Sequence, residues 1–353
     1  MFESLGFENL TAPQVTVFFA LGLGLAFGLL AERTGFCLRR SLVGEDRRAA
    51  AGVWLTALGV ALIGTQAAVQ ADLISFADHR YLVADLPLAA LVVGGLLFGA
   101  GMILTRGCAS RLTVLSGTGN LRALLVMLVF AFVAHATLKG VLAPARVWLN
   151  SFTLPLESAA LPGAPLLWTA ALTLAALAFA LRSGNGALKL AGAALLGLLV
   201  PIGWVGTGYV LYDDFDPVAL ESLAFTAPMA DSLFFGIASS AVPANFGVGL
   251  IGGTVLGSLI AALLFRSFKW QSFETPAQTG RYLLGGALMG FGGVLAGGCT
   301  VGAGLSGIPT LSITALVAIL SIIAGGLVAS RLLNASASGS DAPSTTPAPQ
   351  PAE

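Results

Sequence analysis

Residues 94–108 read GGLLFGAGMILTRGC, and residues 285–299 read GGALMGFGGVLAGGC. The two stretches align without a gap at an offset of 191 residues, and each ends in a cysteine, Cys108 or Cys299. A weaker copy of the pattern ends at Cys37, 71 residues before Cys108. The chain has 3 cysteines in 353 residues, so every one of them closes a glycine-rich apolar run. Thiols placed this regularly indicate a site for a ligand with an affinity for sulfur.

The composition predicts a membrane protein. Hydrophobic residues make up 56% of the chain and charged residues 10%, with a mean hydropathy of +0.90. A soluble domain carries about 25% charged residues, so this chain is expected to lie in membrane lipid. The formal net charge is +0, which gives no reason to expect a nucleic acid partner.

Nine apolar runs have about the 20 residues that an α-helix needs to cross the hydrocarbon core. We therefore predict an all-α polytopic fold with spans near residues 14–32, 50–69, 86–105, 121–142, 164–182, 187–205, 245–265, 281–297 and 311–331. Short semi-polar segments lie between them at residues 35–44, 107–119, 215–241 (in two pieces) and 299–309. Because backbone polar groups in lipid need internal partners, we expect these segments to be re-entrant half-helices buried among the spans.

Positive charge predicts the orientation, since cytoplasmic loops of membrane proteins are rich in Lys and Arg. With the N-terminus outside, 14 of the 17 basic residues fall on the cytoplasmic side, and Arg80, Lys139 and Arg146 fall outside. Several acidic residues between Asp213 and Asp231 share one outer loop. We therefore predict an N-out, C-in topology.

This topology gives the repeat a geometric meaning. The span before Cys108 runs inward and the span before Cys299 runs outward, as an inverted-topology repeat of the kind found in transporters requires. The spans then divide as 4+1+4: repeat one over about 14–142, a linker span at 164–182, and repeat two over about 187–331. We expect residues 1–333 to form a single transmembrane transport domain. Residues 334–353, rich in Ala, Ser, Pro and Thr, predict a disordered cytoplasmic tail.

Three motifs together resemble the YeeE/YedE family of thiosulfate and sulfur-compound transporters. They are GFCL at 35–38, RGCASRL at 106–112 and GGCTVGAGLSG at 297–307. The resemblance implies uptake of thiosulfate, or a related inorganic sulfur anion, across the bacterial inner membrane. It also implies that Cys37, Cys108 and Cys299 line the route and offer their thiols to the substrate. A cytosolic sulfur carrier of the TusA type is a partner that only the resemblance suggests.

The chemistry of thiosulfate suits these residues. A bare dianion costs tens of kcal/mol to move into an apolar medium, so the route must replace water with donors. Half-helix N-termini supply free N–H groups and a positive dipole end. A neutral thiol is a weak donor, and weak binding at several sites lets a substrate leave again. Because no Asp or Glu lies in the interior of a predicted span, we expect channel-like or facilitated passage rather than a carboxylate proton relay.

Eight further residues are secondary candidates for the pathway, although each also has a purely structural explanation. Glycines inside the spans are expected to be packing contacts between helices, whereas Gly107 and Gly298 adjoin thiols. Arg111 is placed to attract an anion beside Cys108, and His135 lies inside a span, where a histidine is a functional candidate. The remaining candidates are hydroxyl donors: Ser110, Ser116, Thr300 and Ser306. His79, in an outer loop, receives no role.

Two other functions stay open at this stage. An intramembrane thiol redox protein coupled to quinone would need two close cysteines, which the sequence does not show on any one segment. A membrane anchor for a sulfur-carrier protein would move no substrate. We expect a transporter rather than an enzyme, with no cofactor and no metal, since the cysteines are not spaced as zinc ligands are.

Overall fold

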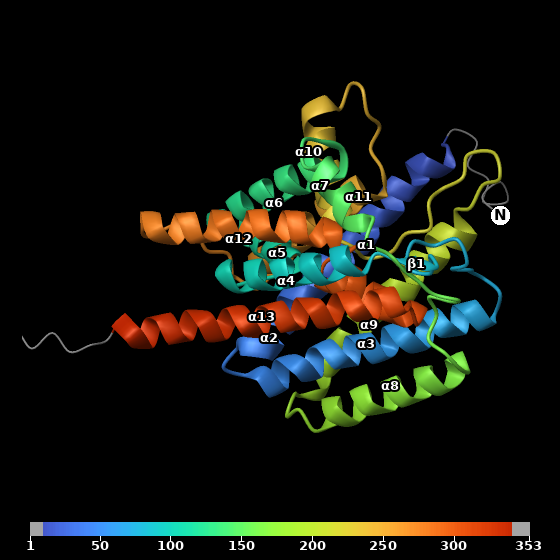
Figure 1. The fold of residues 1–353 in the computed structure, drawn as a ribbon, viewed down its shortest axis with the longest axis horizontal. Helices are drawn as coiled ribbons and strands as arrows, with labels where there is room; N and C mark the ends of the chain where they lie inside the picture. The colour runs from blue at the N-terminus through green and yellow to red at the C-terminus, as the bar shows by residue number, and fades with distance from the viewer. Residues whose placement is uncertain (1–9, 341–353) are drawn as a thin grey trace, which may run out of the picture.

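The protein is a bundle of long helices whose axes run in roughly one direction (Figure 1). The computed structural model describes residues 10–340. Within this range, the nine predicted spans all form helices: α1 (Ala12–Thr34), α3 (Arg47–Gln70), α4 (Leu88–Leu104), α6 (Leu121–Lys139), α8 (Pro165–Leu181), α9 (Ala187–Val205), α11 (Phe246–Leu264), α12 (Pro276–Leu295) and α13 (Ile313–Ser340). The predicted all-α polytopic fold class is therefore confirmed.

Helix α8 differs from the other eight predicted spans, because it is a shorter apolar helix. Among the described residues, 8 helices are long and apolar enough to cross a membrane. Helix α8 has 17 residues, the lower limit for a span. It lies alongside α3, and the two ends of the described chain lie at opposite ends of the bundle (Figure 1). Because an odd number of crossings separates the termini in this way, the arrangement favours α8 as a ninth span.

The predicted half-helix regions fold as short helical segments, with one correction. They are α2 (Leu38–Val43), α5 (Ala109–Gly117), α10 (Thr226–Ala238) and the π-helical turn η3 (Thr300–Gly307), which the 3₁₀ turn η4 (Ile308–Thr310) continues. In the region 215–241, the prediction of two pieces is wrong for the first, because residues 215–225 contain no helix. Pro217 stands in that segment and lacks the N–H that a helix interior needs.

Glycine stripes bring α1 and α11 into direct backbone contact. A Cβ atom added at Gly253 would lie 2.1 Å from the carbonyl oxygen of Leu21. From the other side, a Cβ added at Gly24 would lie 2.2 Å from the carbonyl oxygen of Leu250. Only a residue without a side chain permits this spacing, so the two helices pack through their glycines.

The two repeated stretches of the sequence pack on each other in the same way. A Cβ added at Gly101 of α4 would lie 2.5 Å from the carbonyl oxygen of Gly285 in α12. At the other end of the contact, a Cβ added at Gly292 would lie 2.5 Å from the carbonyl oxygen of Gly94. Helix α13 approaches α4 as closely, since a Cβ at Gly99 would lie 2.2 Å from the carbonyl oxygen of Ile322. The expectation that these glycines are packing contacts is confirmed.

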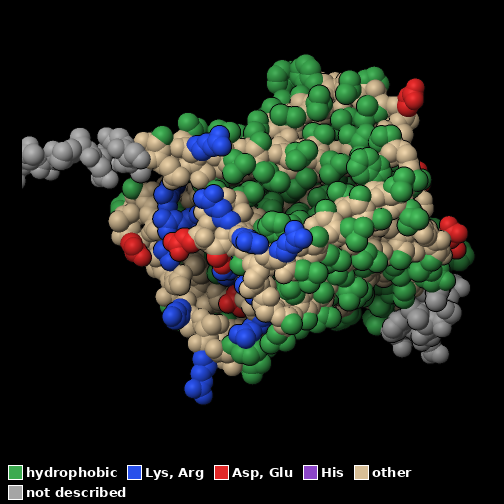
Figure 2. Space-filling view, turned by 90° about the horizontal axis from the view of Figure 1, so that it is seen from below, with side chains coloured by type: hydrophobic (Ala, Val, Ile, Leu, Met, Phe, Trp, Pro, Cys, Tyr) green, Lys and Arg blue, Asp and Glu red, His purple; other side chains and the backbone are tan. Residues whose placement is uncertain are grey.

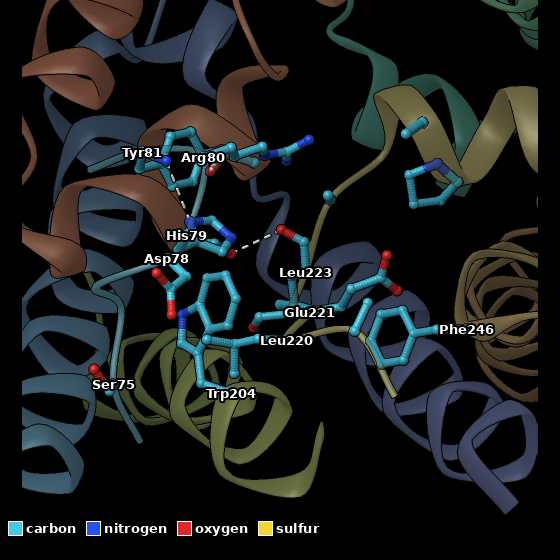
Figure 3. Close-up of a pocket in the computed structure, with 17 residues that line it drawn as sticks. Ser75, Asp78, His79, Arg80, Tyr81, Trp204, Leu220, Glu221, Leu223 and Phe246 are labelled. Atoms are coloured by element: carbon cyan, nitrogen blue, oxygen red, sulfur yellow. Dashed lines mark hydrogen bonds between the residues drawn. The ribbon is translucent and has the colours of Figure 1, made fainter. Parts of the chain in front are cut away.

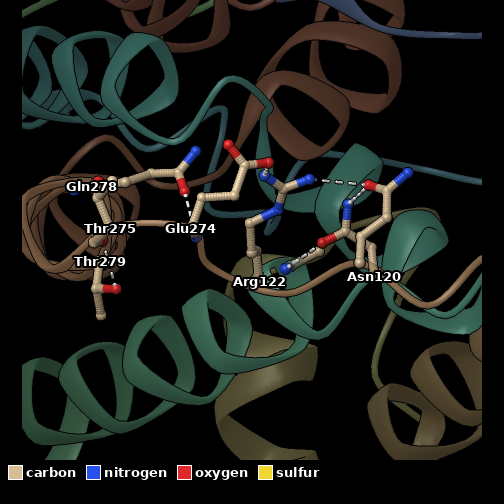
Figure 4. A network of polar contacts seen from close by, with 8 residues as sticks. Asn120, Arg122, Glu274, Thr275, Gln278 and Thr279 are labelled. Atoms are coloured by element: carbon tan, nitrogen blue, oxygen red, sulfur yellow. Dashed lines mark hydrogen bonds and ion pairs between the residues drawn. The ribbon is translucent and has the colours of Figure 1, made fainter.

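Short elements and polar contacts close the two ends of the bundle. At one end, β1 (Asp85–Leu86) pairs antiparallel with β2 (Leu154–Pro155), next to a short helix, α7 (Ala143–Asn150). At the other end, Gln271 Oε1 accepts hydrogen bonds from Asn120 Nδ2 at 2.8 Å and from Arg122 Nη2 at 3.1 Å (Figure 4). Arg122 also pairs with Glu274 at 3.8 Å. These contacts tie the loop between α11 and α12 to the turn between α5 and α6.

Charge is distributed unevenly along the bundle. On the face seen in Figure 2, Lys and Arg side chains gather at one end, and hydrophobic side chains cover most of the remaining surface. This is the end where α2 and the last turns of α13 lie (Figure 1). It carries the loops that the sequence predicts to be cytoplasmic.

The last helix is longer than predicted. Helix α13 ends at Ser340, so the predicted start of the tail at residue 334 lies too early in the chain. The segment 334–340 continues a helix that is already formed, and a helix lengthens more easily than it nucleates. The rest of the predicted tail, residues 341–353, lies outside the described residues.

Substitution of Gly253 by alanine tests the glycine contact between α1 and α11. The added methyl group would collide with the backbone of α1, so we expect Gly253→Ala to cost about 1–3 kcal/mol of stability. The measurement is the melting temperature of the purified protein in detergent. Gly252 is the matched control, because an added Cβ there has no atom within 4 Å. Equal melting temperatures for Gly252→Ala and Gly253→Ala would contradict the packing argument.

Candidate functional site

Each cysteine is the N-cap residue of a short helical segment that follows a break in the chain. Cys37 precedes α2, Cys108 precedes α5 and Cys299 precedes η3. Two positions before each thiol stands a residue with left-handed backbone: Gly35 (φ 65°), Arg106 (φ 58°) and Gly297 (φ 68°). A left-handed residue ends the preceding helix. The three breaks therefore share one local design, in which the chain leaves a long helix, turns, and starts again at a cysteine.

In this arrangement, backbone N–H groups lie near the cysteine sulfurs. Each cysteine side chain faces the N–H group three residues further on: that of Arg40 for Cys37, of Arg111 for Cys108 and of Gly302 for Cys299. The distance from Gly302 N to the Cys299 sulfur is 3.4 Å. The N–H groups in the first turn of a helix have no partners within that helix and carry a positive dipole end. Each break therefore offers both a thiol and free backbone donors at one point.

The thiols of Cys37 and Cys108 meet, although 71 positions separate them in the sequence. The two side chains lie near each other, and both are buried. All three cysteines are free rather than disulfide-bonded. In the described part of the chain, no three His, Cys, Asp or Glu side chains gather as a metal site.

Hydroxyl groups extend this pair toward the third cysteine. The Cys108 sulfur lies 3.3 Å from Ser110 Oγ, and the Thr300 hydroxyl lies near it. Thr300 directly follows Cys299 in the chain, so the break at Cys299 reaches the Cys108 thiol through it. The structure thus brings all three breaks to one place, and it puts Ser110 and Thr300, both sequence candidates, at the central thiol.

Tyr81 ties the Cys299 break to the loop between α3 and β1. Its hydroxyl donates a hydrogen bond to the carbonyl oxygen of Gly302 at 2.9 Å. Its own carbonyl oxygen accepts one from Ser312 Oγ, at the start of α13, at 2.5 Å. Tyr81 is only 2% exposed. The loop and η3 therefore form one continuous wall.

A pocket of about 390 Å³ opens against this wall (Figure 3). Residues of the loop 75–81 and of the segment 219–228 line it, together with Trp204, Phe246 and two residues of η3, Gly302 and Ser306. Since the backbone N–H of Gly302 also donates to the Cys299 sulfur, the pocket adjoins the Cys299 thiol. The loop before β1, which lines the pocket, lies at the end of the bundle opposite α2 and the last turns of α13 (Figure 1).

Charged and titratable side chains surround the pocket. Loss of water around the imidazole lowers the pKa of His79 to about 4, and the positive charge of Arg80 acts in the same direction. Loss of water around the carboxyl raises the pKa of Glu221 to about 7; Arg80 opposes this shift, and Asp231 adds to it. His79 is therefore neutral near pH 7, and Arg80 is a permanent positive charge in the pocket wall.

Ion pairs lie close to the breaks at Cys37 and Cys108. Arg111 Nη1 lies 3.2 Å from Glu32 Oε2, between α5 and the end of α1. Arg40 pairs with Asp46 beside α2. The Arg111 charge, predicted to attract an anion, is therefore partly balanced by Glu32.

The other sequence candidates lie in three different settings. Ser306 donates to the carbonyl oxygen of Leu223 at 2.7 Å and lines the pocket. Ser116 donates to the carbonyl oxygen of Thr113 at 2.6 Å and lines an apolar groove instead. His135 of α6 stacks on Phe234 of α10, with ring centroids 4.8 Å apart.

The two glycines next to the thiols allow the chain to fold back closely. A Cβ added at Gly298 would lie 2.9 Å from the backbone nitrogen of Ala303, and one at Gly107 would lie 3.1 Å from Leu112 Cδ2. In both cases the following helical segment fills the space that a side chain would need. Gly298 is the less replaceable of the two, because its added Cβ would meet backbone rather than a side chain.

Apart from Ser306, sequence reasoning alone misses the residues that line the pocket. It gives no role to His79, and it treats Arg80 and Glu221 only as charges that report topology. One signal was available, because Arg80 is among just three basic residues on the predicted outer side and stands between His79 and Tyr81. That three-residue run is rich in hydrogen-bonding and aromatic groups for a loop of an apolar protein.

Helices that can cross a membrane, broken at buried thiols beneath a charged pocket, define a membrane transport protein. The sequence model of the family described as "Sulphur transport" matches residues 33–328, and the chain belongs to that family. The predicted resemblance is thereby confirmed. Relatives include a protein named "Thiosulfate transporter TsuA" from Spirochaeta thermophila, 31% identical over 265 residues, or 68% of this chain and 76% of the relative. A protein of the same name from Escherichia coli is 27% identical over 318 residues, 80% of this chain and 84% of the relative.

A trivalent arsenical tests the contact between Cys37 and Cys108. Phenylarsine oxide binds firmly where two thiols can hold its arsenic together, so one molecule should stay on the wild-type chain after washing with a monothiol. We expect Cys37→Ser and Cys108→Ser to lose this retention, and Cys299→Ser to keep it. Arsenic per protein chain, measured by mass spectrometry, is the readout. Full retention in Cys37→Ser would show that the two thiols are not paired.

Proposed function

We propose that this protein carries thiosulfate, or a related inorganic sulfur anion, across the bacterial inner membrane into the cytoplasm. The observation that carries the proposal is the meeting of three helix breaks, each with a buried thiol at its N-cap, beside a pocket that contains Arg80. The family and the names of the two relatives support a sulfur anion as substrate. The order of the contacts suggests a route from the pocket to Cys299, then Cys108, then Cys37.

The proposed route replaces hydration with weak neutral donors. Arg80 attracts the anion to the pocket, and Gly302 of η3 lies where the pocket adjoins Cys299. Beyond that point the donors are thiols, backbone N–H groups and the hydroxyls of Thr300 and Ser110. A terminal sulfur that is large and polarisable suits a thiol partner. Because no single donor in this set is strong, the anion can pass from one to the next.

The membrane potential sets a condition on net uptake. Moving a dianion into a cell that is 100 mV negative inside costs about 4.6 kcal/mol, twice the figure for one elementary charge. We propose an N-out, C-in orientation, supported by the basic end of the bundle (Figure 2). Channel-like passage then needs a process in the cytoplasm that consumes the anion, and a TusA-like sulfur carrier is a candidate partner for that step.

An inverted repeat would explain why the breaks converge. We propose that α1–α6 and α9–α13 are the two halves, in the 4+1+4 arrangement with α8 as linker. Direct packing between α4 and α12, the helices that carry the repeated glycine stretches, supports it. A pseudo-two-fold axis between such helices would place their broken ends together.

One observation favours a second candidate function. An intramembrane redox protein needs two close cysteines, and Cys37 and Cys108 lie near each other although they stand on two different segments. A dithiol coupled to quinone would form a reversible disulfide and reduce a soluble quinone analogue. Purified protein that does so without moving thiosulfate would replace the transport proposal.

Flux into proteoliposomes tests the proposed function. We expect purified protein to admit radiolabelled thiosulfate and to prefer it to sulfate, which has no soft terminal sulfur. Cys108→Ala and Cys299→Ala should reduce the initial rate by at least tenfold, because each removes a donor that no neighbour replaces, while Ser116→Ala should stay near wild type. A simple membrane anchor would move nothing. Wild-type rates in both cysteine variants would end the relay proposal.

A further inference from the structure

The Glu221 carboxyl stands in the outer pocket without a partner. Among residues 10–340, the ion pairs join Arg40 to Asp46, Arg111 to Glu32 and Arg122 to Glu274. Neither a salt bridge nor a hydrogen bond within that range engages the Glu221 carboxyl, although Arg80 lines the same pocket (Figure 3). The two opposite charges thus share one space with room between them.

The backbone of Glu221 is nevertheless held firmly. Its N–H donates to Thr207 Oγ1 at 3.0 Å, and its carbonyl oxygen accepts from the same hydroxyl at 2.8 Å. The next residue, Ser222, donates to the carbonyl oxygen of Val200 in α9 at 2.8 Å. The backbone of Glu221 is therefore fixed to the end of α9 and its π-helical continuation η2 (Gly206–Val210), while the residue is exposed and lines the pocket.

Few charged groups face Glu221 from the surrounding elements. The loop before β1 contributes Asp78, His79 and Arg80, and α10 contributes Asp231. The residues that α11 and η3 place in the pocket, Phe246, Gly302 and Ser306, are uncharged. His79, with its pKa near 4, is neutral from pH 6 upward. The charge of Glu221, by contrast, changes within the range from pH 6 to pH 8.

We propose that Glu221 is a proton-binding site coupled to the anion, so that capture of the sulfur anion beside Arg80 takes up one proton from the outer medium. The inference rests on the proposed function. The step is a protonation only: the carboxylate accepts one proton from water and becomes a neutral carboxyl. A carboxylate would repel an arriving dianion, whereas the neutral form can donate its O–H to an anion oxygen. The anion in turn favours the protonated form, so binding and protonation reinforce each other.

The sign of the pH dependence follows from this linkage. Below the pKa of Glu221 the carboxyl is already protonated, so anion affinity should be constant with pH. Above it, each captured anion must bring a proton with it, and the dissociation constant should rise about tenfold per pH unit. The strongest capture is therefore expected on the acidic side of pH 7.

Calorimetric titration with thiosulfate tests the proposal on the full-length protein in detergent. Binding is measured between pH 5.5 and pH 8.5, in two buffers with different heats of ionisation, which reports the number of protons taken up. We expect close to one proton per anion at pH 8 for the wild type. Glu221→Gln, which keeps the shape of the side chain, should bind with no proton uptake and with no slope against pH. Asp78→Asn, a change of another carboxylate in the same pocket, should keep the wild-type slope.

The outcomes separate this proposal from the proposed function. A wild-type protein that binds thiosulfate equally at every pH, or a Glu221→Gln variant with the full wild-type slope, would overturn proton coupling and leave transport standing. Failure of the wild type to bind or admit thiosulfate at any pH would overturn both. Should Glu221→Gln not fold, as judged by its melting temperature, the proton count of the wild type in the two buffers still decides.

Discussion

Backbone-to-backbone contact between helices is the constraint on which the rest of this structure depends. Where α1 meets α11 and α4 meets α12, glycines remove the side chains that would hold the helices apart. Such tight contacts place the ends of broken helices close together near the middle of the bundle. A thiol at the start of a short segment then lies against another segment rather than against lipid. Cys37 and Cys108, which follow α1 and α4, lie near each other in this packed arrangement.

Charge is kept to the two ends of the proposed route. Arg80 and Glu221 stand at the pocket, and the pairs of Arg111 with Glu32 and Arg40 with Asp46 stand near the opposite end. The groups that lie against the three thiols are hydroxyls, backbone N–H groups and another thiol. A fixed positive charge among them would hold an anion too firmly, and a fixed negative one would exclude it. Neutral dipoles avoid both extremes, because their attraction to an anion is moderate at each point.

Hydropathy and charge were sufficient to predict most of the fold. All nine predicted spans form helices, because a run of apolar residues has the same meaning wherever it stands, and among the described residues eight of these helices are long and apolar enough to cross a membrane. The breaks were visible as a glycine one or two positions before each cysteine. The segment 215–225 and the end of α13 were misjudged, since short polar stretches carry no periodic signal. The contact of Cys37 with Cys108 depends on how helices far apart in the sequence pack, which no local pattern records. Glu221 was overlooked for a similar reason, as its surroundings come from three distant parts of the chain.

Tyr81 links the loop at the pocket to both η3 and α13, so these three segments are expected to move together. Its hydroxyl holds the carbonyl of Gly302, and its carbonyl is held by Ser312, so the loop at the pocket mouth is latched to η3 on one side and to α13 on the other. A displacement of that loop would pull on the turn that presents the Cys299 sulfur. The pocket entrance and the Cys299 thiol are therefore mechanically coupled. Widening the entrance without displacing this thiol would require the hydrogen bond between Tyr81 and Gly302 to break.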